Sequence, residues 1–413
     1  MSVPQIDVMD AVATLEARID GTLGDLQSAQ DALRTLEVDQ RLVRRIRGRL
    51  DREIETSRRG VDALAGDLRR ARVSGAVDAI GPLWRDYEKQ LMTLRPVHQE
   101  CLAFIEGILV RSRRLDRGMC NFADELLVEL SDRCGVTWGR FTILGDAEFF
   151  TGLADVIRLR FPKLSIWDLP VAAHEFGHFV ARNLQTLDGR RPFEEAVETQ
   201  AIPIALPANA NYADHLHEYF ADALATYALG PAYPAVCVCL RFDVTAPHDA
   251  GATHPSSFSR AHVMIKALAR KDRGRRISHP FSDLADLLSS IWANAVGATG
   301  CATAISDDQT LVLDEIEDRM FAMLQAALEP AANYAAPSWR RAEDVAARLD
   351  SGDANAQPPG DDTTVADVLN GAWAYRLGDA NPTAASVRDV GAQAAKLCEE
   401  IVERRRREDQ AEA

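Results

Sequence analysis

Two histidines and a glutamate with the spacing of a metal site occur near the middle of the chain. Residues 171–180 read VAAHEFGHFV, so His174 and His178 are four residues apart. On a helix this spacing puts both imidazoles on one face, one turn apart, as two ligands of one zinc ion require. Glu175 is placed to accept a proton from an attacking water. The flanking residues are uncharged, which predicts a buried helix with one polar stripe and favours a zinc site over two core histidines.

A catalytic zinc site usually has three protein ligands, so the chain must supply a third. The metzincin pattern is excluded, because Leu184 stands where it requires histidine and Ala181 where it requires glycine. About forty residues beyond His178, Glu218 and Asp222 lie one turn apart in an apolar run that predicts a second helix. We expect Glu218 to be the third ligand and Asp222 to accept a hydrogen bond from a ligating histidine. The alternative is an ordinary capping or surface pair.

These motifs together resemble those of gluzincin peptidases of the HtpX and CAAX prenyl endopeptidase type. The resemblance rests on three segments, namely HEFGH, Glu218-x-x-Ala221-Asp222, and Thr253-His254-Pro255 followed by Arg260. It implies a bound Zn²⁺ and a role for seven residues: His174, His178 and Glu218 as ligands, Glu175 as general base, Asp222 as support for a ligand, and His254 and Arg260 as groups that assist the transition state.

The sequence departs from this family in two respects. Ser256 stands where the relatives have a second proline after the histidine. The chain also lacks the transmembrane helices typical of those relatives, because its longest apolar run, residues 219–240, contains Asp222 and two prolines. We therefore expect a soluble variant with no membrane span and without a membrane-embedded substrate.

The oxyanion that forms when a carbonyl is attacked needs a hydrogen-bond donor near the metal. Several side chains around the two motifs could supply it: Tyr212, His217, Tyr219, His254 and Arg260. His254 is the preferred candidate, because a glycine-flanked loop can carry its imidazole over the site.

The N-terminal part of the chain has a long apolar heptad register. It spans residues 12–71 and includes Leu15, Ile19, Leu26, Leu33, Leu36, Val43, Leu50, Ile54, Val61, Leu64 and Leu68. This pattern predicts a long amphipathic helix or a coiled coil. Polar residues such as Thr22 interrupt it, and Gly48 and Gly60 each weaken a helix by about 1 kcal/mol relative to alanine. A bent helix or a folded-back hairpin fits equally well.

Further helices are expected at residues 83–94, 97–115 and 121–134, and short strands at 137–145 and 156–162. The segment 156–161 nearly alternates and directly precedes the zinc helix. Many zinc peptidases hold an extended substrate on such a strand by edge pairing; the alternative is a strand that completes a small sheet. Later helices are expected at residues 259–269, 283–295 and 311–328.

The predicted fold class is mainly α (α+β). Residues 1–135 form a helical or coiled-coil module, and residues 136–350 a helical, zincin-like metallopeptidase domain with a small β-sheet. Residues 351–363, rich in small, acidic and proline residues, are expected to form a linker or surface loop, and residues 364–413 a C-terminal helical segment.

Composition limits the class of partner and the compartment. The formal net charge of −15 argues against nucleic acid as a partner, because binding phosphates requires clustered basic residues. Seven scattered cysteines, an odd number, fit a reducing compartment, and the N-terminus has no signal-peptide pattern. We expect a cytoplasmic protein.

The sequence thus predicts a zinc metallopeptidase that acts on a protein or peptide, with a regulatory or substrate-selecting N-terminal module. Self-association through the N-terminal helices is a further expectation. Two alternatives remain: a non-cleaving, zinc-binding coiled-coil scaffold or sensor, and a hydrolase for a non-peptide amide. The presence of Glu175 between the two histidines favours activity over the scaffold.

Overall fold

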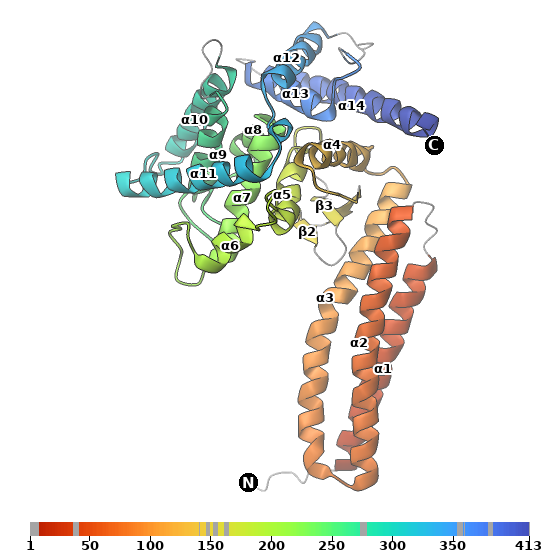
Figure 1. Cartoon of the computed structure of the whole chain (residues 1–413). Coiled ribbons are helices and arrows are strands. Elements are labelled where there is room, and N and C mark those ends of the chain that lie inside the picture. The colour runs from red at the N-terminus through yellow and green to blue at the C-terminus, as the bar shows by residue number, and fades with distance from the viewer. Residues whose placement is uncertain are drawn as a thin grey trace. The chain divides into compact units, whose positions relative to one another are not determined.

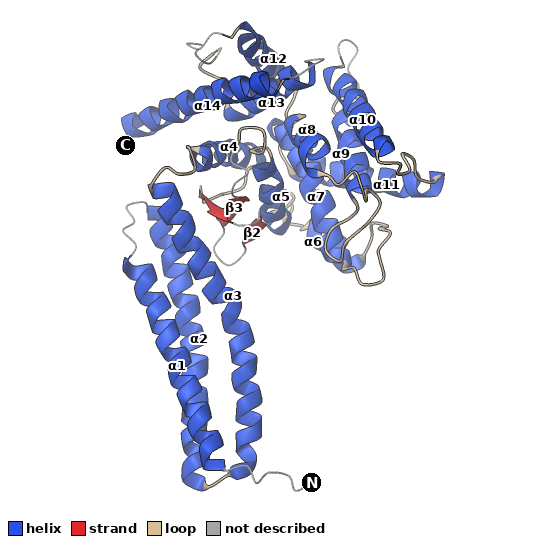
Figure 2. Cartoon of the chain, turned by 180° about the vertical axis from the view of Figure 1, so that it is seen from behind, coloured by secondary structure: helices blue, strands red, loops and turns tan. Residues whose placement is uncertain are grey.

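The computed structural model describes residues 8–35, 41–139, 141–145, 149–151, 156–160, 165–272, 279–352, 358, 360–378 and 383–412. Within these residues the fold is mainly α (α+β), as the sequence predicts: helices dominate and three short strands add a small sheet (Figure 2). The chain divides into two compact units. The first is built on residues up to Arg113 and the second on residues from Arg114 onward, apart from short pieces of the strand region.

The first unit is a bundle of three long helices, which run side by side in Figure 1. They are α1 (Val8–Thr35), α2 (Arg41–Ser74) and α3 (Ile80–Ser112), with the short 3-10 helix η1 (Val77–Ala79) before α3. The heptad face forms its core, since Leu15, Leu26, Leu33, Leu50, Ile54 and Val61 are all fully buried. The predicted apolar face is confirmed, and the chain folds back between α1 and α2. Leu36 and the side chain of Val43 lie outside the described residues.

The expected break between residues 94 and 97 is wrong, because α3 continues through Pro96. Proline inside a helix lacks a hydrogen-bond donor and costs about 3 kcal/mol. Leu94 and Val97 on either side of it are buried in the bundle, which keeps the helix continuous. The polar interruption at Thr22 is also accommodated, since its Oγ1 lies 2.9 Å from the hydroxyl oxygen of Tyr87.

The sheet has three strands, β1 (Thr142–Gly145), β2 (Phe149–Thr151) and β3 (Val156–Arg160), in the order β1-β3-β2. The central strand is therefore β3, and both of its edges are already paired. This corrects the expectation that an extended substrate adds to this segment, because backbone groups that pair with neighbouring strands cannot pair with a peptide. Four consecutive residues of β3 are buried and Arg160 is exposed, as in a strand covered on both faces.

The second unit consists of helices α4 to α14. They are α4 (Met119–Cys134), α5 (Val171–Asn183), α6 (Pro192–Thr199), α7 (Tyr212–Leu229), α8 (Ala232–Val236), the π-helix η2 (Cys237–Arg241), α9 (Ser257–Arg270), α10 (Pro280–Ala298), α11 (Asp307–Ala327), the 3-10 helix η3 (Pro330–Ala332), α12 (Ala336–Ser351), α13 (Val365–Gly378) and α14 (Ala384–Glu412). The boundary expected after residue 135 is displaced, because α4 packs against α5, α7, α13 and α14. Much of the expected linker at 351–363 lies outside the described residues.

Two contacts fix the helices that carry the candidate site. Gly177 of α5 lies so close to α7 that an added Cβ would be 2.6 Å from the Cα of Ala221, so only glycine permits this approach. At the end of α7, Asn370 of α13 accepts a hydrogen bond from the Ala232 nitrogen (2.8 Å) and donates one to the Leu229 oxygen (2.7 Å). The C-terminal helix α13 therefore holds the connection from α7 to α8.

No helix in the described parts of the chain combines the length and the hydropathy needed to cross a membrane. All seven cysteines carry free thiols.

Candidate metal centre

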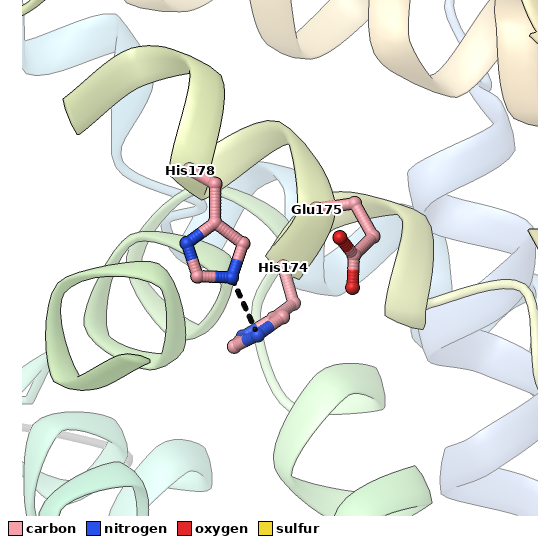
Figure 3. A group of neighbouring side chains, drawn as sticks. All are labelled: His174, Glu175 and His178. Atoms are coloured by element: carbon pink, nitrogen blue, oxygen red, sulfur yellow. Dashed lines mark hydrogen bonds between the residues drawn. The ribbon is translucent and has the colours of Figure 1, made fainter. Parts of the chain in front are cut away.

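Helix α5 presents His174, Glu175 and His178 as one group (Figure 3). The Nε2 atoms of the two histidines face each other at 3.2 Å, and His174 and Glu175 are buried. One ligand atom from each of the three residues lies within 4.8 Å of the others, so that the group could hold a metal ion. The spacing on the helix therefore produces the convergence that the sequence predicts.

Helix α7 brings Glu218 to the same point. Its Oε2 lies 3.4 Å from Nε2 of His174, and its Oε1 lies 3.4 Å from Nε2 of His178. Burial alone would raise the pKa of Glu218, but the guanidinium of Arg260 and the two histidines hold it well below its ordinary value. Glu218 is therefore a buried carboxylate that stays ionised beside two imidazoles.

A second carboxylate, that of Asp222, lies behind His174 and is bound by the guanidinium of Arg260. Asp222 is completely buried and its Oδ1 lies 3.0 Å from Nδ1 of His174. Arg260 donates to both of its oxygens, from Nε to Oδ2 and from Nη2 to Oδ1, each at 2.8 Å. Burial opposes ionisation of Asp222, but Arg260 lowers its pKa. Burial alone would lower the pKa of His174. Its hydrogen bonds and charge interactions with Asp222 and Glu218 outweigh burial and raise this pKa to about 10.

Tyr233 joins this group although the sequence did not point to it. Its hydroxyl oxygen is 2.9 Å from Nδ1 of His174, it donates to Oδ1 of Asp222, and its ring stacks on the imidazole. Burial and the neighbouring Asp222 raise the pKa of Tyr233 well above its ordinary value, so the hydroxyl keeps its proton. The residue lies in α8, in the segment Gly230-Pro231-Ala232-Tyr233 just after α7, where no periodic pattern marks it. Only the packing of α8 against α5 reveals it.

His254 lies at the mouth of the site. Its side chain is 61% exposed and its Nε2 is 3.4 Å from Oε1 of Glu218. The loop that carries it is fixed by a hydrogen bond from the Gly251 nitrogen to the His254 oxygen (2.9 Å), and His215 contacts the Gly251 oxygen at 3.0 Å. His254 is therefore an accessible imidazole beside Glu218, whereas Arg260 is largely buried and paired with carboxylates.

Most of these side chains line a pocket of about 560 Å³. It includes His174, Glu175, His178, His217, Glu218, His254 and Arg260. Two of the five oxyanion donors expected from the sequence, Tyr212 and Tyr219, are not among its described lining residues. The Tyr212 hydroxyl instead bonds the backbone of Ile202, donating to its oxygen at 3.0 Å and accepting from its nitrogen at 3.2 Å. The candidates in reach of the pocket are thus His217, His254 and Arg260.

Comparisons of the chain with protein-family models, with curated proteins and with solved structures give no match.

Proposed function

We propose that the chain is a zinc-dependent metallopeptidase of the gluzincin type. The observation that supports this most strongly is the convergence of His174, His178 and Glu218 from two helices, with Glu175 beside them in one pocket. In this proposal the two histidines and Glu218 are the ligands, Glu175 is the general base, and the substrate is a protein or peptide. The three-helix N-terminal bundle regulates access or selects substrates.

The spacings between the candidate donor atoms are close to those around a tetrahedral zinc ion. Bonds of about 2.0–2.1 Å at tetrahedral angles separate neighbouring donors by about 3.3–3.4 Å. The two imidazole Nε2 atoms lie 3.2 Å apart, and Glu218 lies 3.4 Å from each of them, with Oε2 toward His174 and Oε1 toward His178. Oε2 of Glu218 is buried and accepts no hydrogen bond from any described residue, although Nη1 of Arg260 lies 3.0 Å away as an ion-pair partner. A metal ion would therefore add a second positive partner to this oxygen.

When bound, zinc would supply Lewis acidity, which polarises a scissile carbonyl and makes water more acidic. Glu175 accepts the proton of the attacking water and passes it to the leaving amine. Asp222 and Tyr233 hold His174 in the tautomer that leaves Nε2 free to bind the metal. His254 is the preferred donor to the oxyanion because it is exposed beside the ligands, while Arg260 keeps Asp222 and Glu218 ionised.

Glu175→Gln tests this function directly. Amide nitrogen cannot serve as a base, so we expect turnover of a mixed peptide library to fall by at least about 100-fold, with bound zinc remaining near one per chain. Mass spectrometry of the peptides measures cleavage, and metal analysis measures zinc. Glu194→Gln on α6, a partly exposed glutamate away from the pocket, is the matched control and should retain activity.

The same experiment separates the alternatives. Cleavage that persists in Glu175→Gln would rule out the proposed mechanism. Zinc without peptide cleavage in the wild-type chain would favour the non-cleaving scaffold or the hydrolase for a non-peptide amide. Glu218→Ala should lower zinc occupancy, and full occupancy in that variant would remove Glu218 from the ligands.

A further inference from the structure

The N-terminal bundle exposes large apolar side chains on one helix in particular. Within the described parts of its three helices, Met92, Leu102 and Leu109 of α3 are exposed, and on α1 and α2 the corresponding residue is Val73 alone, near the end of α2. Leu102 is 57% exposed and Leu109 is 51% exposed. The exposed positions of α1 carry charged, polar or small residues instead. The uncovered apolar surface of the described bundle is therefore concentrated on α3.

Leu102 and Leu109 belong to a second heptad stripe on this helix. The bundle core uses the register of Tyr87, Leu94, Cys101 and Ile108, which are all buried. The second stripe is shifted from it by one position, and each of its members is half-buried or exposed. Such an alternation of four- and three-residue steps with mostly apolar residues is the pattern by which a helix packs against a further helix. The members of the stripe are Leu91, Arg95, His98, Leu102, Ile105 and Leu109.

Two opposite charges lie toward the same edge of this stripe. Arg95 and Glu106 are both exposed, and neither forms a hydrogen bond or an ion pair with a described residue. They are eleven residues apart, so at 3.6 residues per turn their directions differ by only about 20° around the helix axis. Flanking charges that face each other across two helices determine partner and orientation. When two copies of one helix pack antiparallel, equal edges meet, so Arg95 of each copy faces Glu106 of the other.

We propose that the stripe on α3 binds a second copy of this chain, with the two α3 helices antiparallel. The register that sets Arg95 opposite Glu106 also brings Leu109 near Leu91 and Leu102 near His98 of the other copy, so charge pairing and apolar packing agree on one alignment. The charge pattern is complementary to itself, which favours a second copy over an unrelated partner. This inference does not depend on the proposed peptidase function.

Sedimentation velocity over a concentration series tests the dimer. We expect the wild-type chain to dimerise reversibly. Leu102→Glu combined with Leu109→Glu places charges on two positions that are already more than half exposed, so the monomer should remain folded while the dimer is lost. Val73→Glu, on α2 and outside the stripe, is the matched control and should dimerise as the wild type does. Circular dichroism verifies that the variants are folded.

Charge reversal tests the antiparallel alignment. Arg95→Glu alone, or Glu106→Arg alone, sets like charges opposite each other twice in each dimer. Each should therefore raise the dissociation constant of the dimer by about tenfold at low ionic strength. The double reversal restores opposite charges and should return the constant to the wild-type value. In a parallel dimer the two residues would lie on opposite sides of the contact and could not compensate each other in this way.

A wild-type chain that stays monomeric at every concentration would overturn the proposal, as would dimerisation that persists unchanged in the double leucine variant. Single reversals without effect, or a double reversal that does not restore the wild-type constant, would overturn the antiparallel pairing. None of these measurements requires cleavage of a peptide. Their outcome therefore stays separate from the success or failure of the proposed function.

Discussion

At the scale of single residues, Tyr233 connects the rear of His174 to the Asp222–Arg260 pair through one oxygen atom. The pairing is buried, so each partner depends on the others: Asp222 needs Arg260 as counter-ion, and the imidazole needs an acceptor for its Nδ1 proton. Removing one partner of such a group usually costs more than the pair contributes, because the remaining charge stays buried. Substitution of the uncharged Tyr233 leaves no buried charge unpaired, so it is the least disruptive way to test how the groups behind His174 affect metal binding.

We expect Tyr233→Phe to lower zinc affinity by about 10- to 100-fold, the usual effect of losing a hydrogen bond behind a ligand. The ring still fills its space, so the fold should persist. Competition with a chromophoric chelator measures the affinity. Tyr375→Phe on α13, which is outside the pocket lining, should leave it unchanged. An unaltered affinity in Tyr233→Phe would mean that Asp222, 3.0 Å from Nδ1, orients His174 alone.

Sequence patterns predict most residues of the candidate site, because residues four apart on a helix lie on the same face of that helix. His174, His178, Glu218 and Asp222 follow from two i, i+4 pairs, and the structure brings them together. Tyr233 does not follow, since its position depends on how α8 returns toward α5 after a glycine and a proline. The pairing of Arg260 with Asp222 likewise depends on tertiary packing, which no local spacing encodes.

At the scale of elements, the crossing of α5 and α7 determines whether the ligands meet. Local patterns predict both helices, but not the closeness of their approach at Gly177. The same limit explains two of the errors in the fold: strand order depends on pairing between distant segments, and the continuity of α3 through Pro96 depends on burial in the bundle. In both cases tertiary contacts override a local signal.

Gly177→Ala should separate the two helices. Its Cβ would lie 2.6 Å from Cα and 2.9 Å from Cβ of Ala221, and backbone cannot move aside as a side-chain tip can. We expect a loss of about 1–3 kcal/mol in the free energy of unfolding, typical of overpacking, together with weaker zinc binding. Chemical denaturation measures the first. Gly297→Ala in α10, where an added Cβ meets only ordinary contact, should cause no loss; equal stability of both variants would contradict the packing argument.

Lys271 gives a pH dependence at the same scale. Its Nζ donates to the Tyr227 oxygen (2.7 Å) and to Oδ1 of Asn333, linking α9 to α7 and to the end of η3. Burial and then Arg133 hold the pKa of Lys271 well below its ordinary value. Between the folded pKa and the unfolded value of about 10.4, the unfolded chain binds more protons, so stability rises with pH.

The stability of the wild type relative to Lys271→Met should therefore increase as pH is raised from about 7 toward about 10. Urea unfolding at a series of pH values measures this difference. Lys89→Met, on the exposed side of α3, should show no such trend. A wild-type advantage that is constant over the range would mean that Lys271 is protonated alike in both states.

At the scale of the whole molecule, all candidate site residues belong to the second unit, and the three-helix bundle contributes none. The side chains of the candidate metal centre are therefore all supplied by helices of the second unit. Its regulatory role, self-association through its helices and a cytoplasmic location stay predictions. The second unit, by contrast, buries Glu218 and Asp222 beside the largely buried Arg260, where unbalanced charge is costly.

Removal of metal should consequently destabilise the second unit. A ligand that binds only the folded state adds RT ln(1 + [L]/Kd), about 2.7 kcal/mol at a concentration of 100 Kd. We expect chelation to lower the melting temperature by several degrees and zinc to restore it, because the cation balances Glu218 and engages its Oε2, which accepts no hydrogen bond from a described residue. Calorimetry measures the shift. His178→Ala, which lacks one ligand, should melt at nearly the same temperature with and without chelator. If the melting temperature of this variant responds to chelator as that of the wild type does, the stabilising metal binds elsewhere. The stabilisation would then give no evidence for a metal centre between α5 and α7.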